Sequence, residues 1–318
     1  MQVLITGVAG FIGSHLAEHL LSKGLTVVGL DNFDTFYDRK LKESNIAVAL
    51  QHKNFSFYEA DISDLESLNK IVFKGDLVIH LAAKAGVRPS IQNPSAYIQN
   101  NIIGTQNMHH FMQARGIHKM VFASSSSIYG NNKKTPFSET DNVDYPISPY
   151  AFTKKAGELL NYTFHELYKT DVINLRFFTV YGERQRPDLA IHKFVKAISK
   201  NEPIPLYGNG ETGRDYTYVK DIVAGIASAA DYVMDNKGVY EIINLGNSHP
   251  VKLNELVKAI EKILGKEAII QWLPMQPGDA EFTYADISKA AKLLNYHPST
   301  LLETGLTNFI NWYQQTNP

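Results

Sequence analysis

Short runs of apolar residues alternate with amphipathic segments along the first half of the chain. Six of these runs are apolar throughout instead of alternating with polar residues, which is typical of parallel strands covered on both faces. The predicted strands are residues 3–6, 26–30, 55–60, 77–83, 120–125 and 172–178. Segments with helical periodicity lie between them, such as residues 14–24 with Leu16, Leu20 and Leu21. This alternation predicts an α/β fold with a parallel, doubly wound sheet.

The pattern changes after Phe178, where Gly, Pro and Asn interrupt residues 201–213. One more apolar run, residues 240–246, is predicted to return to the sheet. A helix over residues 253–264 and a Pro-containing loop over residues 272–282 follow. We therefore expect a smaller C-terminal lobe, built from segments that leave the sheet and rejoin it.

Composition narrows the class of protein. The 318 residues are 44% hydrophobic and 20% charged, which is enough for an ordinary core. The 31 Lys and Arg nearly balance the 32 Asp and Glu, so we expect neither nucleic-acid nor membrane binding. The absence of cysteine excludes disulfides, thiolate catalysis and cysteine metal sites. No signal peptide or apolar span of about 20 residues is visible in the sequence, and we expect a cytoplasmic protein.

Three glycines follow the first predicted strand. Gly7, Gly10 and Gly13 stand where this strand gives way to a helix, and such glycines let the backbone approach a pyrophosphate at the helix N-terminus. Asp31 ends the second strand, where a carboxylate binds the ribose hydroxyls and repels a 2′-phosphate. The motif predicts NAD rather than NADP; the alternative is a purely structural turn.

Tyr150 and Lys154 are four residues apart and therefore share one face of a predicted helix. A phenol with a pKa of about 10 is a poor base, but a neighbouring ammonium, with the positive nicotinamide ring nearby, favours the phenolate and lowers that pKa. The fifth strand ends in a serine run at the carboxyl edge of the sheet, where ligands of such folds bind. Ser125, with Ser127 close by, could bind a substrate oxygen beside Tyr150.

These motifs together resemble the extended short-chain dehydrogenase/reductase family, specifically its nucleotide-sugar branch. The resemblance covers essentially the whole chain and rests also on "HLAA" (residues 80–83) and "NNIIGT" (residues 100–105). It implies a Rossmann-like NAD-binding domain of residues 1–178 and about 215–247, with a UDP-sugar-binding lobe of residues 179–214 and 248–318. A homodimer formed by the helix that carries Tyr150 is also implied.

The resemblance also assigns site residues. The expected cofactor-binding residues are Gly7, Gly10, Phe11, Ile12, Gly13, Asp31, Asn32, Asp61, Ile62, Leu81, Ala82, Ala83, Lys84, Asn100, Tyr150 and Lys154. The expected substrate-binding residues are Arg88, Ser125, Ser127, Thr179, Arg186, Arg214 and Asp279. Asp61 and Ile62 would flank the adenine, Lys84 and Asn100 would hold the phosphate and ribose region, Arg214 would grip the UDP diphosphate, and Asp279 the uridine ribose. Gln276 stands where many relatives have Arg, so one diphosphate contact is expected to differ.

The family's shared chemistry is transient oxidation of the sugar at C4, with Tyr150, Lys154 and Ser125 as catalytic residues. A dehydratase needs a further acid–base pair near the serine run, and the sequence offers no carboxylate there. An epimerase needs only room for the 4-keto sugar to rotate before hydride returns. Epimerisation leaves no net redox change, so NAD should stay bound.

Four segments resemble UDP-glucuronate 4-epimerases more closely than UDP-glucose 4-epimerases, which usually have Asn where Thr179 stands. They are "RFFTVYG…RPD", "AAKAGVRPSI", "DNFDTFYD" and "MQPGD". Arg186 could bind a hexuronate carboxylate, with Thr179 donating its hydroxyl. In the alternative reading, Arg184 and Arg186 are solvated loop charges, or Arg186 simply pairs with Asp188.

The leading hypothesis is an NAD-dependent UDP-glucuronate 4-epimerase. Three others stay open: an epimerase of UDP-glucose or another UDP-hexose, a UDP-glucuronate decarboxylase, and a non-catalytic NAD-sensing protein. No metal is expected, because His15 and His19 have helical spacing but no visible third ligand. His80, within an apolar strand, is expected to be a hydrogen-bonded core histidine.

Overall fold

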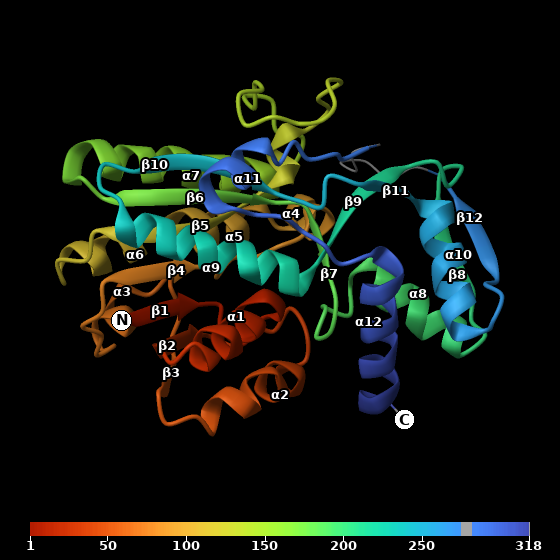
Figure 1. Ribbon diagram of the computed structural model, residues 1–318, viewed down its shortest axis with the longest axis horizontal. Coiled ribbons are helices and arrows are strands. Elements are labelled where there is room, and N and C mark those ends of the chain that lie inside the picture. Colours follow the sequence, from red (N-terminus) through yellow and green to blue (C-terminus); the bar gives the residue numbers. More distant parts are fainter. Residues whose placement is uncertain (275–281, 318) are drawn as a thin grey trace.

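The computed structural model describes residues 1–274 and 282–317. Within these residues, seven strands form one sheet in the order β10-β6-β5-β4-β1-β2-β3 (Figure 1). The strands are β1 (Gln2–Thr6), β2 (Thr26–Asp31), β3 (Phe55–Glu59), β4 (Leu77–His80), β5 (Lys119–Ser125), β6 (Asp171–Phe177) and β10 (Tyr240–Leu245). All neighbours in the sheet pair in parallel, which confirms the predicted doubly wound α/β fold.

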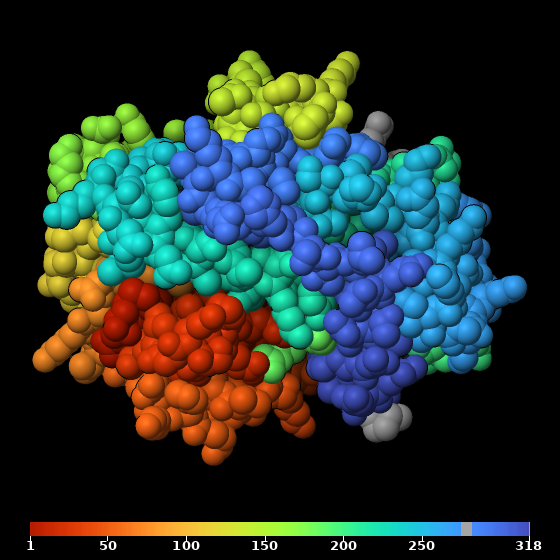
Figure 2. Space-filling model, in the orientation of Figure 1, coloured from red at the N-terminus to blue at the C-terminus, as the bar shows by residue number. Residues whose placement is uncertain are grey.

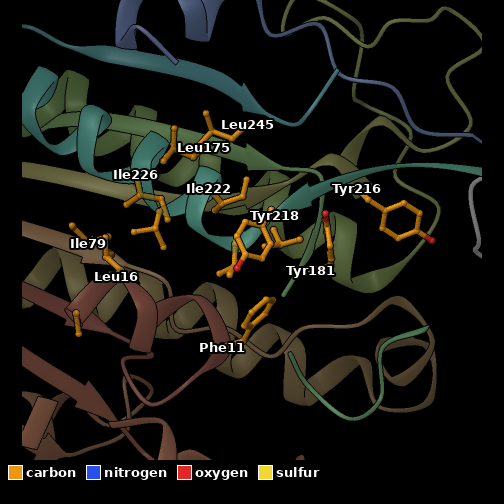
Figure 3. Packing of buried hydrophobic residues seen from close by; sticks show 14 of the residues in the cluster. Phe11, Leu16, Ile79, Leu175, Tyr181, Tyr216, Tyr218, Ile222, Ile226 and Leu245 are labelled. Carbon is orange, nitrogen blue, oxygen red and sulfur yellow. The ribbon is translucent and has the colours of Figure 1, made fainter. Parts of the chain in front are cut away.

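Each face of this sheet is covered by helices. Along β1, Val3 and Ile5 belong to one buried cluster and Leu4 to another, because successive side chains of a strand point to opposite faces. The first cluster packs against α1 (Phe11–Ser22) and α9 (Val219–Asp235), and Figure 3 shows Leu16, Ile222 and Ile226 meeting there. On the surface these two helices lie side by side, in red and cyan in Figure 2.

The other helices of the sheet complete both layers. They are α2 (Arg39–Leu50), α3 (Leu65–Asn69), α4 (Val87–Gln92), α5 (Pro94–Tyr97), α6 (Gly104–Gln113), α7 (Pro149–Tyr168) and α11 (Ser288–Leu294). A π-helical segment, Ile98–Ile103, leads into α6, and a 3₁₀ turn, Ser126–Tyr129, follows β5. Met108 and Phe111 of α6 belong to the second buried cluster.

Four predicted strands of the large sheet end earlier in the structure: β3, β6 and β10 by one residue, and β4 by three. β4 ends at His80 rather than at residue 83, because the Ala82 N–H turns to the side-chain oxygen of Thr6 instead of a neighbouring strand. The predicted sixth strand divides at Phe178, and the three residues after it form β7 (Thr179–Tyr181). β7 leaves the large sheet and pairs with β9 (Gly213–Tyr218), so Thr179 lies where the chain departs.

The segments that leave the sheet form two further sheets in the described part of the chain. One has the order β11-β9-β7, with β11 at Pro250–Lys252, and the other pairs β12 (Ile270–Leu273) with β8 (Ile204–Tyr207). With α8 (Ala190–Ser199), α10 (Leu253–Leu264) and α12 (Leu302–Thr316) they occupy the right side of Figure 1. The predicted return of residues 240–246 is confirmed, since β10 pairs with β6.

Candidate active site

Two neighbouring cavities open at the carboxyl edge of the large sheet. The first has a volume of about 470 Å³ and is lined from the ends of β1, β2 and β5 and from α7. The second has a volume of about 480 Å³ and lies toward α8, β8 and β9. Residues that line both are Phe36, Gly86, Val87, Thr179, Arg186 and Leu189. Ligands of doubly wound sheets bind at this edge, so a molecule in one cavity can reach a molecule in the other.

The glycine loop forms one wall of the first cavity. Gly7 has φ +73°, and a Cβ at Gly13 would lie 2.2 Å from the Gly7 carbonyl oxygen, so neither position accommodates a side chain. Among the described residues, no side chain caps the N-terminus of α1, and its first residues Phe11 and Ile12 line the cavity with Gly10. Helix N–H groups left open in this way are suited to a diphosphate.

Asp31 closes the same wall at the end of β2. Its carboxylate accepts hydrogen bonds from the Phe33 N–H at 2.9 Å and the Ala9 N–H at 3.1 Å. Burial raises the pKa of Asp31 from its ordinary value. Asn32 lines the cavity beside it, and both residues lie where the ribose of a dinucleotide is held in this fold.

Lys42 is a cavity residue that sequence reasoning missed. Its buried ammonium donates a hydrogen bond to the Asp34 carbonyl at 2.7 Å. Burial lowers the pKa of Lys42, and the negative charge of Asp31 partly offsets this decrease. Lys42 lies on α2 among several other charged residues, so the sequence shows only a helical lysine. Its place in the cavity depends on how α2 packs, which no local pattern reveals.

The predicted adenine and phosphate residues divide into two groups. Ile62 and Asn100 line the cavity, as do the three residues after β4, namely Leu81, Ala82 and Ala83. Asp61 and Lys84 lie behind the lining within the described part of the chain. Asp61 accepts from Asn32 at 2.8 Å, and the Lys84 ammonium pairs with Asp34 at 2.6 Å.

The three predicted catalytic residues meet at the floor of the first cavity. Ser125 ends β5, Tyr150 lies in the first turn of α7, and both line this cavity. The Ser125 hydroxyl is close enough to Tyr150 to favour its phenolate form. Lys154 follows one turn later, 6.0 Å from the centroid of the Tyr150 ring, and donates to the Ala123 carbonyl at 2.7 Å. The Ser148 hydroxyl caps α7 by accepting from the Ala151 N–H, which fixes the start of the helix.

Burial dominates the electrostatics of Tyr150 and Lys154. Burial lowers the pKa of Lys154 to about 7. Burial also raises the pKa of Tyr150, and the opposing influences of the Ser125 hydrogen bond and the Arg186 charge do not reverse the direction. In the protein alone, desolvation of the phenolate thus outweighs its favourable partners. The predicted lowering of the Tyr150 pKa also invoked the positive nicotinamide ring, and it stays a prediction for the complex with NAD.

Arg186 and Thr179 lie where the two cavities meet. The two carboxylate oxygens of Asp188 accept hydrogen bonds from the Arg186 guanidinium, one from Nε at 2.9 Å and one from Nη2 at 2.8 Å. The guanidinium also lies 5.2 Å from the centroid of the Phe36 ring, and the Arg186 side chain is only 17% exposed. The pairing with Asp188 that was left open as an alternative is thus present, while Arg186 still faces both cavities.

Arg184 is not the solvated loop charge considered above. Its side chain is 18% exposed and pairs with Glu18 on α1 at 2.7 Å. The neighbouring Glu183 carbonyl accepts a hydrogen bond from the His15 ring at 2.9 Å. The loop that carries Arg186 is thereby attached to the helix that follows the glycine loop.

The remaining predicted substrate residues lie toward the second cavity or outside the described residues. Arg88 and Arg214 line the second cavity, and the Arg88 guanidinium lies 4.5 Å from the centroid of the Tyr207 ring. Ser127 sits behind the lining and donates to the Ser125 hydroxyl at 3.0 Å. Asp279 and Gln276 lie outside the described residues.

A buried polar network behind the catalytic residues was also missed. Glu158 on α7 accepts two hydrogen bonds from Arg176 of β6, both at 2.9 Å, and one from Ser124 at 2.6 Å. Arg176 also donates to the Tyr129 hydroxyl at 3.0 Å. The available signal was an arginine inside a mainly apolar strand, since a buried charge needs a partner. The network fixes the end of β5 next to Ser125.

The described residues contain no cluster of three or more His, Asp or Glu side chains able to hold a metal ion. No helix in residues 1–274 or 282–317 is both long and apolar enough to cross a membrane.

Comparison with known proteins places the chain in a family. Residues 4–309 match the family described as GDP-mannose 4,6 dehydratase. The chain is 43% identical over 315 residues to a UDP-glucuronate 4-epimerase of Thermodesulfobacterium geofontis, covering 98% of this chain and 96% of that protein.

Two solved structures share the fold over nearly the whole chain. The UDP-glucuronic acid 4-epimerase of Bacillus cereus, in complex with UDP-glucuronic acid and NAD, has a TM-score of 0.92 and 36% identity, covering 99% of this chain and 100% of that one. The UDP-glucose 4-epimerase of Thermotoga maritima with UDP-glucose has a TM-score of 0.90 and 31% identity, with full coverage of both chains. The chain therefore belongs to the GDP-mannose 4,6-dehydratase family of extended short-chain dehydrogenases/reductases, which confirms the predicted resemblance to the nucleotide-sugar epimerases.

Proposed function

We propose that the protein interconverts UDP-glucuronate and UDP-galacturonate by epimerisation at C4, with NAD as resident cofactor. The observation that carries this proposal is the position of Arg186 and Thr179 at the junction between the cavity of Tyr150 and the cavity of Arg88 and Arg214. A sugar that bridges the two cavities places its ring beside both groups. Two relatives that carry the same activity in their names support the proposal.

The first cavity fits a nicotinamide dinucleotide. The N–H groups at the start of α1 would bind the diphosphate, since a Cβ at Gly13 would close this approach. Asp31 would accept hydrogen bonds from the ribose hydroxyls, and its negative charge would repel the 2′-phosphate of NADP, which favours NAD. Lys42 would lie on the same side of the adenosine as Asp31. When bound, NAD supplies the acceptor for the hydride that leaves C4 and is later returned to it.

Tyr150 would act as the base. Its phenolate oxygen would take the proton of the sugar 4-hydroxyl as the C4 hydrogen leaves as hydride, and Ser125 would hold the same sugar oxygen. The proton returns to the 4-keto oxygen once the sugar has turned its other face toward the cofactor. Lys154, with its pKa of about 7, adds positive charge near the phenolate when it is protonated.

The carboxylate contact would also separate epimerisation from decarboxylation. A 4-keto-uronate loses CO₂ when the breaking C–C bond stands perpendicular to the carbonyl plane. Arg186 and Thr179, by holding the carboxylate, would keep that bond out of this geometry. UDP-glucose remains the second candidate substrate, because the relative from T. maritima is named as a UDP-glucose 4-epimerase.

The test is direct. Purified protein is incubated with UDP-glucuronate or UDP-glucose, and the products are identified by NMR. We expect UDP-galacturonate without UDP-pentose, release of NAD(H) on denaturation, and no turnover by Tyr150→Phe, which keeps its fold and UDP binding. Exclusive turnover of UDP-glucose would contradict the substrate, and full activity of Tyr150→Phe would contradict the mechanism.

We also propose that the protein is a homodimer that pairs through α7, in the cytoplasm. Leu159 and Tyr162 on this helix are 56% and 48% exposed, and Phe152 is exposed on the same helix. Large apolar side chains gathered on one helix commonly mark a contact between proteins. The absence of cysteine is compatible with a reducing compartment.

A further inference from the structure

Asp188 already gives Arg186 a carboxylate partner. Its two oxygens contact Nε and Nη2 of the guanidinium, at 2.9 and 2.8 Å, which is the bidentate geometry of a strong ion pair. Asp188 lines the second cavity, whereas Arg186 lines both. A guanidinium has five N–H groups, and this pair engages two of them. Arg186 can therefore donate hydrogen bonds to a second carboxylate while Asp188 stays in place.

Two carboxylates on one cation interact unfavourably with each other. With Asp188 present, the pair has no net charge before a sugar binds, and a uronate brings a second anion to a single arginine. A neutral hexose meets a guanidinium that is already compensated. Without the Asp188 charge, Arg186 would have no carboxylate partner among the described residues. A neutral hexose would then leave a largely buried cation unpaired, whereas a uronate would supply the missing carboxylate.

From these contacts we infer that Asp188 is a specificity-determining residue that weakens discrimination between uronate and neutral sugars. It acts as an internal carboxylate that compensates Arg186 when the sugar has none. The inference rests on the proposed function, in which Arg186 receives the sugar carboxylate.

The loop does not depend on Asp188 for its position. The Gln185 N–H donates to the Gly182 carbonyl at 3.1 Å, and the His192 ring donates to the Gln185 carbonyl at 2.9 Å. Arg184 holds the same loop to α1, and the Phe36 ring lies beside the Arg186 guanidinium. Removing the Asp188 charge should therefore change electrostatics and leave the backbone in place.

The experiment compares ligand affinities in an Asp188→Asn variant, which keeps the size of the side chain and one oxygen acceptor. Both proteins carry Tyr150→Phe to prevent turnover, and calorimetry measures Kd for UDP-glucuronate, UDP-glucose and UDP. We expect the ratio of Kd for UDP-glucose to Kd for UDP-glucuronate to rise about threefold to tenfold, because a repulsion between like charges is removed. Kd for UDP should not change, since UDP lacks the sugar.

Asp188→Glu serves as the matched control, because it keeps the charge and should retain a ratio close to that of the unsubstituted loop. An unchanged or lower ratio in Asp188→Asn would overturn the inference and would assign Asp188 to orienting Arg186 instead. Failure of the proposed function looks different: the wild-type protein would then not epimerise UDP-glucuronate, whatever Asp188 does.

Discussion

At the scale of single residues, Arg186 connects the identity of the sugar to the chemistry at C4. It lines the cavity of Tyr150, and its positive charge partly offsets the rise in the Tyr150 pKa that burial causes. It also lines the neighbouring cavity together with Arg88 and Arg214. One side chain can thus bind a carboxylate and influence the base that starts the reaction.

Arg186→Met should lower kcat/KM for UDP-glucuronate by about ten- to a hundredfold, as expected for one charge-assisted hydrogen bond that is lost. The loss with UDP-glucose should be much smaller, because only the effect of the Arg186 charge on Tyr150 is removed. Some UDP-pentose should form because the carboxylate is no longer restrained. Steady-state kinetics with both sugars and NMR of the products measure this. Lys196→Met is the matched control, since this lysine on α8 is exposed. An equal loss for both sugars would mean that Arg186 is structural.

His80 is confirmed as a hydrogen-bonded core histidine. Thr105 donates to the Asn101 carbonyl, so its oxygen is free to accept from the His80 Nε2–H, and the Thr6 hydroxyl donates to Nδ1. This arrangement requires the neutral ring. Burial lowers the pKa of His80 to about 3.

Stability should therefore depend on pH through His80. Below its ordinary pKa of 6.5 the unfolded chain takes up a proton that the folded chain, with a pKa of about 3, does not. Stability is lost as the pH falls, by about 2 kcal/mol between pH 7.5 and pH 5 for this one group. Urea unfolding at both pH values measures it. His80→Gln should show a pH-dependent loss smaller by about that amount, and an identical loss would contradict the assignment.

At the scale of elements, α1 and the glycine loop form one close-packed unit. The Gly7 carbonyl occupies the space in which a Cβ at Gly13 would lie, and the Gly7 backbone itself packs against Ala82. The loop that carries Arg186 is held to the same helix through Arg184 and Glu18. A shift of α1 would thus disturb both cavities.

Gly13→Ala should displace α1 and destabilise the fold by about 1–3 kcal/mol, as overpacking commonly does. The purified variant should also carry much less NAD(H). Thermal unfolding and the nucleotide released on denaturation measure both effects. Ser22→Ala, at the exposed end of the same helix, is the control and should change neither. Full NAD(H) content in Gly13→Ala would show that the loop tolerates the added methyl group.

The sequence predicts the large sheet well because most of its strands are mainly apolar runs with clear boundaries. β7, β8, β9, β11 and β12 were missed. Four of them have only three or four residues, which gives too little periodicity, and β9 includes the charged residues Arg214 and Asp215. Residues next to motifs, such as Ser125 and Tyr150, were found from local patterns. Lys42 and Glu158 were not, because their roles depend on how distant helices pack.

At the scale of the whole molecule, the two cavities meet between parts of the chain with different architectures. We propose that residues 1–178 and about 215–247 form the NAD-binding domain, with residues 179–214 and 248–318 as the UDP-sugar lobe. β7 and β9, which pair with each other, connect the large sheet to this lobe.

The proposed homodimer gives a prediction at this scale. Leu159→Glu with Tyr162→Glu should convert the dimer into a monomer, because charges would replace the exposed apolar face of α7. Sedimentation velocity measures the mass. Leu301→Glu, at another exposed apolar position, is the matched control and should stay dimeric. If the wild-type protein is itself monomeric, the dimer proposal fails.

The return of β10 to the edge of the large sheet limits how this enzyme can be re-engineered. The chain crosses between the two parts at β7, at β9 and again after β10, so no single cut separates a substrate module from a cofactor module. Grafting a contiguous C-terminal half from a relative would also exchange β10, and with it the partner that covers β6. A change of sugar preference is therefore more accessible by replacing individual side chains in residues 179–189 than by recombining whole segments.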